Sequence, residues 1–173
     1  MRSPRVLVLL VAILAGGVGF LAYRMTFTER LLTEATAELM RLKLPDTSGK
    51  EQPLAQWRDK VLVVNFWATW CAPCREEIPG FIQFQERFRA DGVQFVGVAI
   101  DQKERVAPYA KEMGINYPLV VGGLETMEFA RQLGNQRSVL PFTLVIDRSG
   151  KVASVQVGML RPEKLESLLK PLL

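Results

Sequence analysis

The sequence contains no histidine and only two cysteines, Cys71 and Cys74, among its 173 residues. A structural zinc site takes about four nitrogen or sulfur ligands, which this chain cannot supply. A copper carrier normally adds a histidine to its soft ligands. A purely structural disulfide over so short a loop would constrain the unfolded chain very little. The two thiols therefore pair with each other or act alone.

The net charge is also close to zero over most of the chain. The formal net charge is +4, but three basic residues, Arg2, Arg5 and Arg24, lie in the first 24 positions. Residues 25–173 then hold 19 basic and 18 acidic side chains, without a basic cluster. Binding to nucleic acid needs a basic patch, so we expect no nucleic-acid partner.

A Cys-x-x-Cys motif follows an apolar run that begins at Val61 and ends in aromatic residues. The run predicts a buried strand, and the residues after it predict a helix that begins at Cys71. Pro73 suits the first turn of that helix. Free N–H groups and the helix dipole stabilise a thiolate at Cys71. A Cys-x-x-Cys between strand and helix is typical of a thioredoxin-like redox site, and we favour this over the metal and structural readings.

The rest of the chain from residue 39 predicts one α/β domain. Strands are expected from Val61 and at 93–100, 117–121, 142–146 and 151–157. Helices are expected from Cys71 and at 102–113, 124–133 and 162–169, with Pro108 breaking the second of them. Strands alternate with helices at first and a hairpin follows, so the central sheet should be mixed and flanked by helices.

The N-terminal segment, 1–24, predicts a membrane anchor. Residues 6–23 carry no charge, and eighteen helical residues span about 27 Å, close to the roughly 30 Å of a hydrocarbon core. A cleaved signal peptide is the alternative, because residues 15–19 offer small side chains to a peptidase. The apolar run continues past them, which favours an uncleaved anchor. Residues 25–38 are expected to be a spacer with a helix capped by Thr28.

The segment Phe-Trp-Ala-Thr-Trp-Cys-Ala-Pro-Cys-Arg-Glu-Glu-Ile-Pro at residues 66–79 resembles the active-site signature of membrane-anchored TlpA/ResA-type thioredoxin-like proteins. The likeness extends from about Leu42 to the C-terminus. It implies a thioredoxin-like fold with an extra strand and helix inserted between Tyr117 and Leu133. It also implies a domain on the extracytoplasmic (periplasmic) side. We expect no metal and no cofactor.

The same resemblance implies the reaction and its partners. We expect a protein-disulfide reductase that receives electrons from a membrane dithiol carrier. Its substrates would be protein disulfides, for example those of apocytochrome c cysteines that await haem.

Two residues carry the expected chemistry. Cys71, at the helix start, is the predicted nucleophile that forms a mixed disulfide with the substrate, and Cys74 is the resolving thiol. The resemblance implies that Pro141 is a cis-proline opposite the motif, where backbone groups beside Leu140 and Pro141 bind an extended substrate. It also places Trp70 at the rim of the site, whereas Trp67 is expected in the core.

Asn65 departs from thioredoxin, which has a buried aspartate at the matching position for proton transfer to the resolving cysteine. Asparagine does not titrate. Glu77 lies three residues after Cys74 and on the same face of the expected helix, so it can supply the carboxylate instead. The spacing alone equally allows a solvated surface charge, and the resemblance to ResA-type proteins favours the functional reading.

Two other functions remain as alternatives. A thiol peroxidase is expected to have a threonine three residues before its reactive cysteine, whereas Thr69 lies two residues before Cys71 and position 68 is alanine. A copper metallochaperone would hold Cu(I) through the two thiols without an enzymatic step.

Overall fold

The computed structural model describes residues 4–173, with side chains at 13–27 and 30–173. Its centre is a five-stranded sheet in the order β5-β4-β3-β6-β7. The strands are β3 (Val61–Trp67), β4 (Val93–Ile100), β5 (Leu119–Gly122), β6 (Phe142–Ile146) and β7 (Val152–Val157). Strands β3, β4 and β5 are parallel, and β6 and β7 are antiparallel to their neighbours. The predicted mixed sheet is therefore confirmed.

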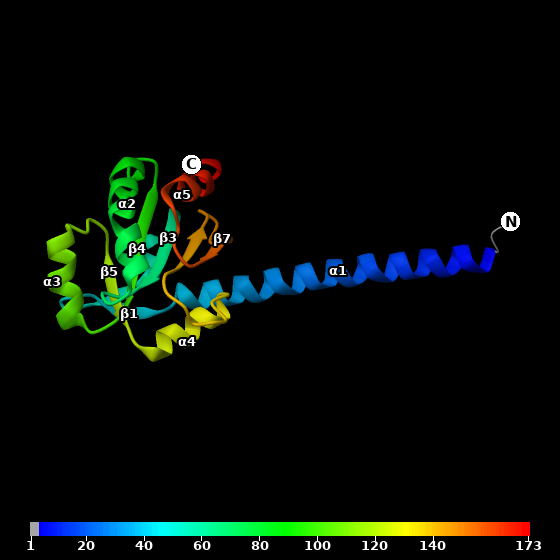
Figure 1. The fold of residues 1–173 in the computed structure, drawn as a ribbon, viewed down its shortest axis with the longest axis horizontal. Coiled ribbons are helices and arrows are strands. Elements are labelled where there is room, and N and C mark those ends of the chain that lie inside the picture. The colour runs from blue at the N-terminus through cyan, green and yellow to red at the C-terminus, as the bar shows by residue number, and fades with distance from the viewer. Residues whose placement is uncertain (1–3) are drawn as a thin grey trace.

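Helices cover both faces of this sheet (Figure 1). On one face lie α2 (Ala72–Phe88), α3 (Lys103–Met113) and α5 (Pro162–Leu169), and on the other lie α4 (Leu124–Gln132) and the end of α1 (Pro4–Leu39). Every residue of β3 is buried, with Val63 and Trp67 facing the first helical layer and Leu62 and Val64 facing the second. A strand covered on both faces is mostly apolar, which explains the apolar run in the sequence, and Asn65 is the one polar residue of β3.

The carboxyl ends of the parallel strands lie at the same edge of the sheet. Trp67 at the end of β3 lies beside Ala99 near the end of β4, and Phe142 at the start of β6 lies beside Phe66. The segment that begins at Cys71 and the segments before β6 and after β4 and β5 therefore meet at the carboxyl edge of the sheet. Loops at this edge are where α/β proteins commonly place their sites.

The inserted strand and helix predicted between Tyr117 and Leu133 are present as β5 and α4. A small hairpin of β1 (Lys43–Pro45) and β2 (Glu51–Pro53) lies beside β5, where Asp46 pairs with Val120. Short 3-10 helices, η1 (Leu54–Trp57) and η2 (Lys170–Leu172), complete the chain.

The break predicted at Pro108 is wrong, because α3 runs unbroken from Lys103 to Met113. Proline removes one helical hydrogen bond, from its own nitrogen to the carbonyl of Glu104. Both residues are exposed, so water can satisfy that carbonyl. Gly114 ends the helix in the left-handed conformation, with φ 64°.

The expected division between anchor and spacer does not appear in the backbone. One helix, α1, continues from Pro4 to Leu39, so no new helix begins at Thr28. The sequence has neither glycine nor proline from Phe20 to Leu44, and nothing interrupts the helix there. Its last turns pack on the domain through Ala35 and Leu39, and the helix projects away from there (Figure 1).

Within the residues searched, no helix is long and apolar enough to cross a membrane. Residues 6–12 of the expected span lie outside the described side chains. The membrane anchor therefore stays a prediction.

Candidate active site

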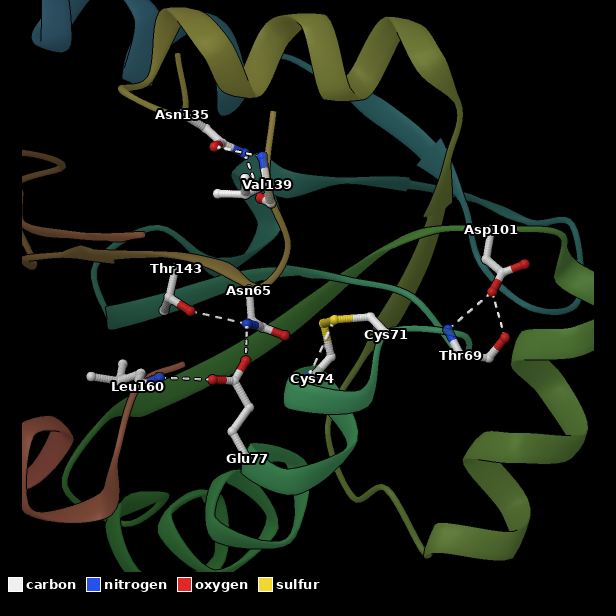
Figure 2. Close-up of a disulfide and its surroundings, with 10 residues drawn as sticks. All are labelled: Asn65, Thr69, Cys71, Cys74, Glu77, Asp101, Asn135, Val139, Thr143 and Leu160. Atoms are coloured by element: carbon white, nitrogen blue, oxygen red, sulfur yellow. Dashed lines mark hydrogen bonds between the residues drawn. A yellow bond between two sulfur atoms is a disulfide. The ribbon is translucent and has the colours of Figure 1, made fainter. Parts of the chain in front are cut away.

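Cys71 and Cys74 form a disulfide at the N-terminus of α2 (Figure 2). Cys71 is the N-cap residue, and its sulfur accepts a hydrogen bond of 3.3 Å from the backbone N–H of Cys74. The Cys71 side chain keeps 5% of its surface exposed and Cys74 keeps none. An incoming sulfur can therefore reach Cys71 and not Cys74, which agrees with the predicted nucleophile and resolving thiol.

Glu77 lies one turn after Cys74 and points into the protein, with 5% of its surface exposed. Its Oε1 accepts a hydrogen bond of 2.8 Å from the side-chain amide of Asn65, and its Oε2 accepts one of 2.9 Å from the backbone N–H of Leu160. The reading of Glu77 as a solvated surface charge is therefore wrong. Two N–H donors hold the carboxyl group in one orientation beneath the disulfide (Figure 2).

Asn65 connects this carboxyl group to the sheet. Its amide nitrogen also donates to the hydroxyl oxygen of Thr143 at 2.9 Å, across the paired strands β3 and β6. Its Oδ1 is buried and has no hydrogen-bond partner among the described residues. Figure 2 shows this oxygen on the side of Asn65 that faces the disulfide. An acceptor in this place can receive a hydrogen bond from a thiol once the disulfide is reduced.

Burial raises the pKa of Glu77 to about 7, against the hydrogen bonds from Leu160 and Asn65, which lower it. The carboxyl group therefore changes its protonation near neutral pH, where a proton acceptor or donor is most effective. Tyr117 is buried nearby, and its burial followed by the charge of Glu77 raises the pKa of its phenol. Tyr117 thus stays neutral, and its ring packs on Phe95 in the core.

Asp101 follows β4 and fixes the turn before Cys71. Its Oδ2 accepts hydrogen bonds from the backbone N–H of Thr69 at 3.0 Å and from the Thr69 hydroxyl at 2.5 Å. Partial burial acts to raise the pKa of Asp101, but the hydrogen bonds from Thr69 and Gln102 and the nearby charge of Arg105 outweigh it and lower that pKa. An ionised carboxylate therefore holds the segment that presents the nucleophile.

The peptide bond between Leu140 and Pro141 is cis, as the resemblance implied. The loop before it is held by Asn135, whose side chain is fully buried and hydrogen-bonds both backbone groups of Val139. Gly158 donates its N–H to the carbonyl of Pro141 at 2.8 Å. The loop thus has a fixed shape at the same edge of the sheet as Cys71.

Exposed apolar side chains lie at the edge of the sheet that carries the thiols. Trp70 is 63% exposed next to Cys71, as expected of a rim residue, whereas Trp67 is buried in the core. Leu124, after β5, and Val139, before the cis-proline, are also exposed at this edge. Exposed apolar groups around a reactive thiol fit a partner that brings an apolar polypeptide surface.

The structure brings together the predicted residues Trp70, Cys71, Cys74, Leu140 and Pro141 at one edge, with Glu77 buried beneath them. Sequence reasoning missed three polar residues that shape the site, Asp101, Asn135 and Thr143. Thr143 could have been found from the strand pairing, because it lies opposite Asn65. Asp101 and Asn135 bind backbone groups of other segments, which no local sequence pattern shows.

Comparison with known proteins gives one family. The model of the AhpC/TSA family matches residues 35–155. The chain is similar to the thiol-disulfide oxidoreductase ResA of Geobacillus kaustophilus, with 30% identity over 98% of this chain and 93% of the relative. It is 31% identical to ResA of Bacillus subtilis, over 95% of this chain and 90% of the relative.

Solved structures agree with this. A thiol:disulfide interchange protein of the thioredoxin family from Chlorobium tepidum superposes with a TM-score of 0.69 and 33% identity, covering 76% of this chain and 92% of that one. A DsbF homologue from Corynebacterium diphtheriae gives a TM-score of 0.68 and 27% identity, covering 78% and 85%. The fold is therefore thioredoxin-like.

The buried carboxyl group of Glu77 predicts how stability depends on pH. Its pKa is about 7 in the folded protein and 4.5 as the ordinary value. Because the folded state binds this proton more tightly, the stabilisation is complete below about pH 4.5 and is lost as the pH rises through 7. Relative to Glu77→Gln, the wild-type disulfide form should lose up to about 3 kcal/mol of unfolding free energy over this range.

Urea unfolding at several pH values measures this difference. The neighbouring exposed carboxylate offers a matched control, and Glu76→Gln should follow the wild-type curve. Parallel curves for wild type and Glu77→Gln would show that Glu77 titrates as an ordinary carboxyl group.

Proposed function

This chain belongs to the AhpC/TSA family and is a thiol-disulfide oxidoreductase of the ResA/DsbE type, and we propose that it is a membrane-tethered enzyme that reduces protein disulfides outside the cytoplasm. The observation that carries the proposed direction is the buried Glu77 beneath a Cys-x-x-Cys pair of unequal exposure.

The reaction begins with the dithiol form. The thiolate of Cys71 attacks one sulfur of a substrate disulfide, a Cys71–substrate bond forms, and the other substrate sulfur leaves as a thiolate that takes up a proton. The Cys74 thiolate then attacks the Cys71 sulfur and releases the second substrate thiolate, which is also protonated. Two electrons pass to the substrate, and the enzyme ends as the Cys71–Cys74 disulfide.

Glu77 serves the second step as the acceptor of the proton that Cys74 must lose. Its pKa of about 7 matches this task near neutral pH. Asn65 takes the place of a titrating residue and instead binds and orients Glu77.

In Glu77→Gln, the pH profile of substrate reduction should lack one ionisation near pH 7, and an unchanged profile would exclude Glu77 from the reaction.

A thiol peroxidase fits the site less well. The threonine nearest to Cys71 is Thr69, and its hydroxyl donates a hydrogen bond to Asp101. The hydroxyl is thereby committed to the turn, and alanine occupies the position where a peroxidase threonine is expected.

The proposed location and partners rest on the sequence. The uncharged residues 6–23 and the resemblance to membrane-anchored proteins support a tether with the domain on the extracytoplasmic side. A membrane dithiol carrier would return the Cys71–Cys74 disulfide to the dithiol. Apocytochrome c cysteines are one candidate substrate, and their short Cys-x-x-Cys disulfides are of the kind that a dithiol enzyme resolves.

Unequal roles of the two cysteines predict unequal trapping of substrates. Cys74→Ser should accumulate mixed disulfides with its substrates, because the resolving thiol is gone, whereas Cys71→Ser should form none. Non-reducing gels after purification from cells measure the adducts, and mass spectrometry names the trapped proteins. Trapping by both variants alike would contradict the assignment.

The direction of electron flow predicts a low reduction potential. Ala72 and Pro73 offer no cation to stabilise a thiolate, and an ionised Glu77 opposes a second negative charge nearby. Arg75 acts in the other direction but is exposed, where its effect is weaker. Equilibration with glutathione should give a value near the ~−270 mV of thioredoxin, and a value near the ~−120 mV of DsbA would contradict a reductase.

The tether predicts that the N-terminal segment stays on the mature protein. The full-length chain should remain with membranes after washing in high salt, with an N-terminus at or near Met1 by mass spectrometry. A mature N-terminus between Gly17 and Thr28 would instead show cleavage of a signal peptide.

A further inference from the structure

Asn135 makes an unusual pair of contacts in the loop between α4 and β6. Its amide nitrogen donates to the carbonyl oxygen of Val139 at 2.9 Å, and its Oδ1 accepts from the N–H of Val139 at 3.1 Å (Figure 2). The side chain is fully buried. It thus binds Val139 as a neighbouring strand would, and both backbone groups of Val139 are satisfied within the protein.

Backbone hydrogen bonds of the loop also hold Asn135 in place. The backbone N–H of Asn135 donates to the carbonyl of Ala130 in α4 at 3.0 Å, and its carbonyl accepts from the N–H of Ser138 at 2.9 Å. Ser138 has φ 50°, a left-handed conformation that residues other than glycine rarely adopt. The bonds around Asn135 therefore impose a backbone shape that the loop would not choose alone.

This loop shape leaves the backbone groups of one residue at the active site, Leu140, without a hydrogen-bond partner among the described residues. Val139 is bonded to Asn135, and the carbonyl of Pro141 is bonded to Gly158. Among the described residues, neither the N–H nor the carbonyl of Leu140 has a hydrogen-bond partner. Leu140 lies just before Phe142, which pairs with β3 at the edge that leads to Cys71.

We infer that Asn135 is a positioning residue for substrate binding, which holds the backbone of Leu140 in the orientation that pairs with an extended polypeptide beside the attacked disulfide. The inference rests on the proposed function and adds Asn135 to the extended-substrate site beside Leu140 and Pro141 that the resemblance implies. A small disulfide has no backbone to offer, so its reduction depends on Cys71 and not on Asn135.

Two variants separate this role from a general structural one. Asn135→Ala removes both bonds to Val139. Asn135→Leu fills nearly the same volume without either bond and without a buried charge. Asn116→Ala is the matched control, because Asn116 is exposed and makes a single bond of 3.1 Å to the carbonyl of Ile82.

The pre-reduced full-length proteins are mixed with an excess of one of two disulfides, and tryptophan fluorescence follows a single turnover. The probes are an unstructured synthetic peptide with an internal Cys-x-x-Cys disulfide, and bis(2-hydroxyethyl) disulfide. Both Asn135 variants should need about tenfold more peptide for half-maximal rate, which corresponds to the loss of one or two hydrogen bonds. The maximal rate, the rate with the small disulfide and the reduction potential should stay at wild-type values.

Three results would overturn the inference. The first is that both variants reach half-maximal rate at the wild-type peptide concentration. The second is an equal loss of rate with both probes, and the third is that neither variant reacts with the small disulfide; either of these would make Asn135 a residue of the fold alone. Should the Ala variant not fold, the Leu variant, which has nearly the same volume, decides the matter. If the wild-type protein reduces neither probe, the proposed function itself fails.

Discussion

The hydrogen bond between Asn65 and Glu77 joins the sheet to the helix that carries the thiols. Asn65 also bonds Thr143 of β6, and Glu77 bonds the backbone of Leu160 in the segment before α5. Four parts of the chain therefore meet at one carboxyl group beneath the disulfide. A buried carboxyl group without such partners would cost several kcal/mol, so the position of Glu77 depends on all of them.

This arrangement sets two electrostatic effects against each other at the disulfide. The N-terminus of α2 favours a thiolate at Cys71, and the Cys74 N–H already donates to its sulfur. The carboxylate of Glu77, once ionised, disfavours a second charge close by. Because its pKa lies at about 7, this opposition grows as the pH rises through neutrality. A strongly stabilised thiolate would make the site an oxidant, so this opposition supports the proposed reductase.

Most of the fold could be predicted from the sequence. Apolar runs bounded by glycine, proline and aspartate predicted the bounds of β4, β6 and α5, and those of β7 to within one residue. The position of Cys71 at a helix start followed from local rules. The polar network was less accessible. Asn65 forms a hydrogen bond with Thr143, 78 positions away, and Glu77 forms one with Leu160, 83 positions away. Burial of Glu77 depends on these distant partners, so spacing on a helix left it undecided, and Asn135 has a backbone partner that no residue type reveals.

The polar contacts around the disulfide fall into two groups with different tasks. Beneath the disulfide, Asn65 and Glu77 hydrogen-bond to each other and to Thr143 and Leu160, and their proposed task is to handle a proton and a charge. At the rim, Asp101 holds the turn before Cys71 and Asn135 holds the loop before the cis-proline, each through backbone groups. Loops fixed from within the protein lose little further entropy when a substrate strand binds between them. The rim therefore offers a substrate a surface that is already fixed in shape, and the exposed Trp70 beside Cys71 contributes an apolar side chain to it.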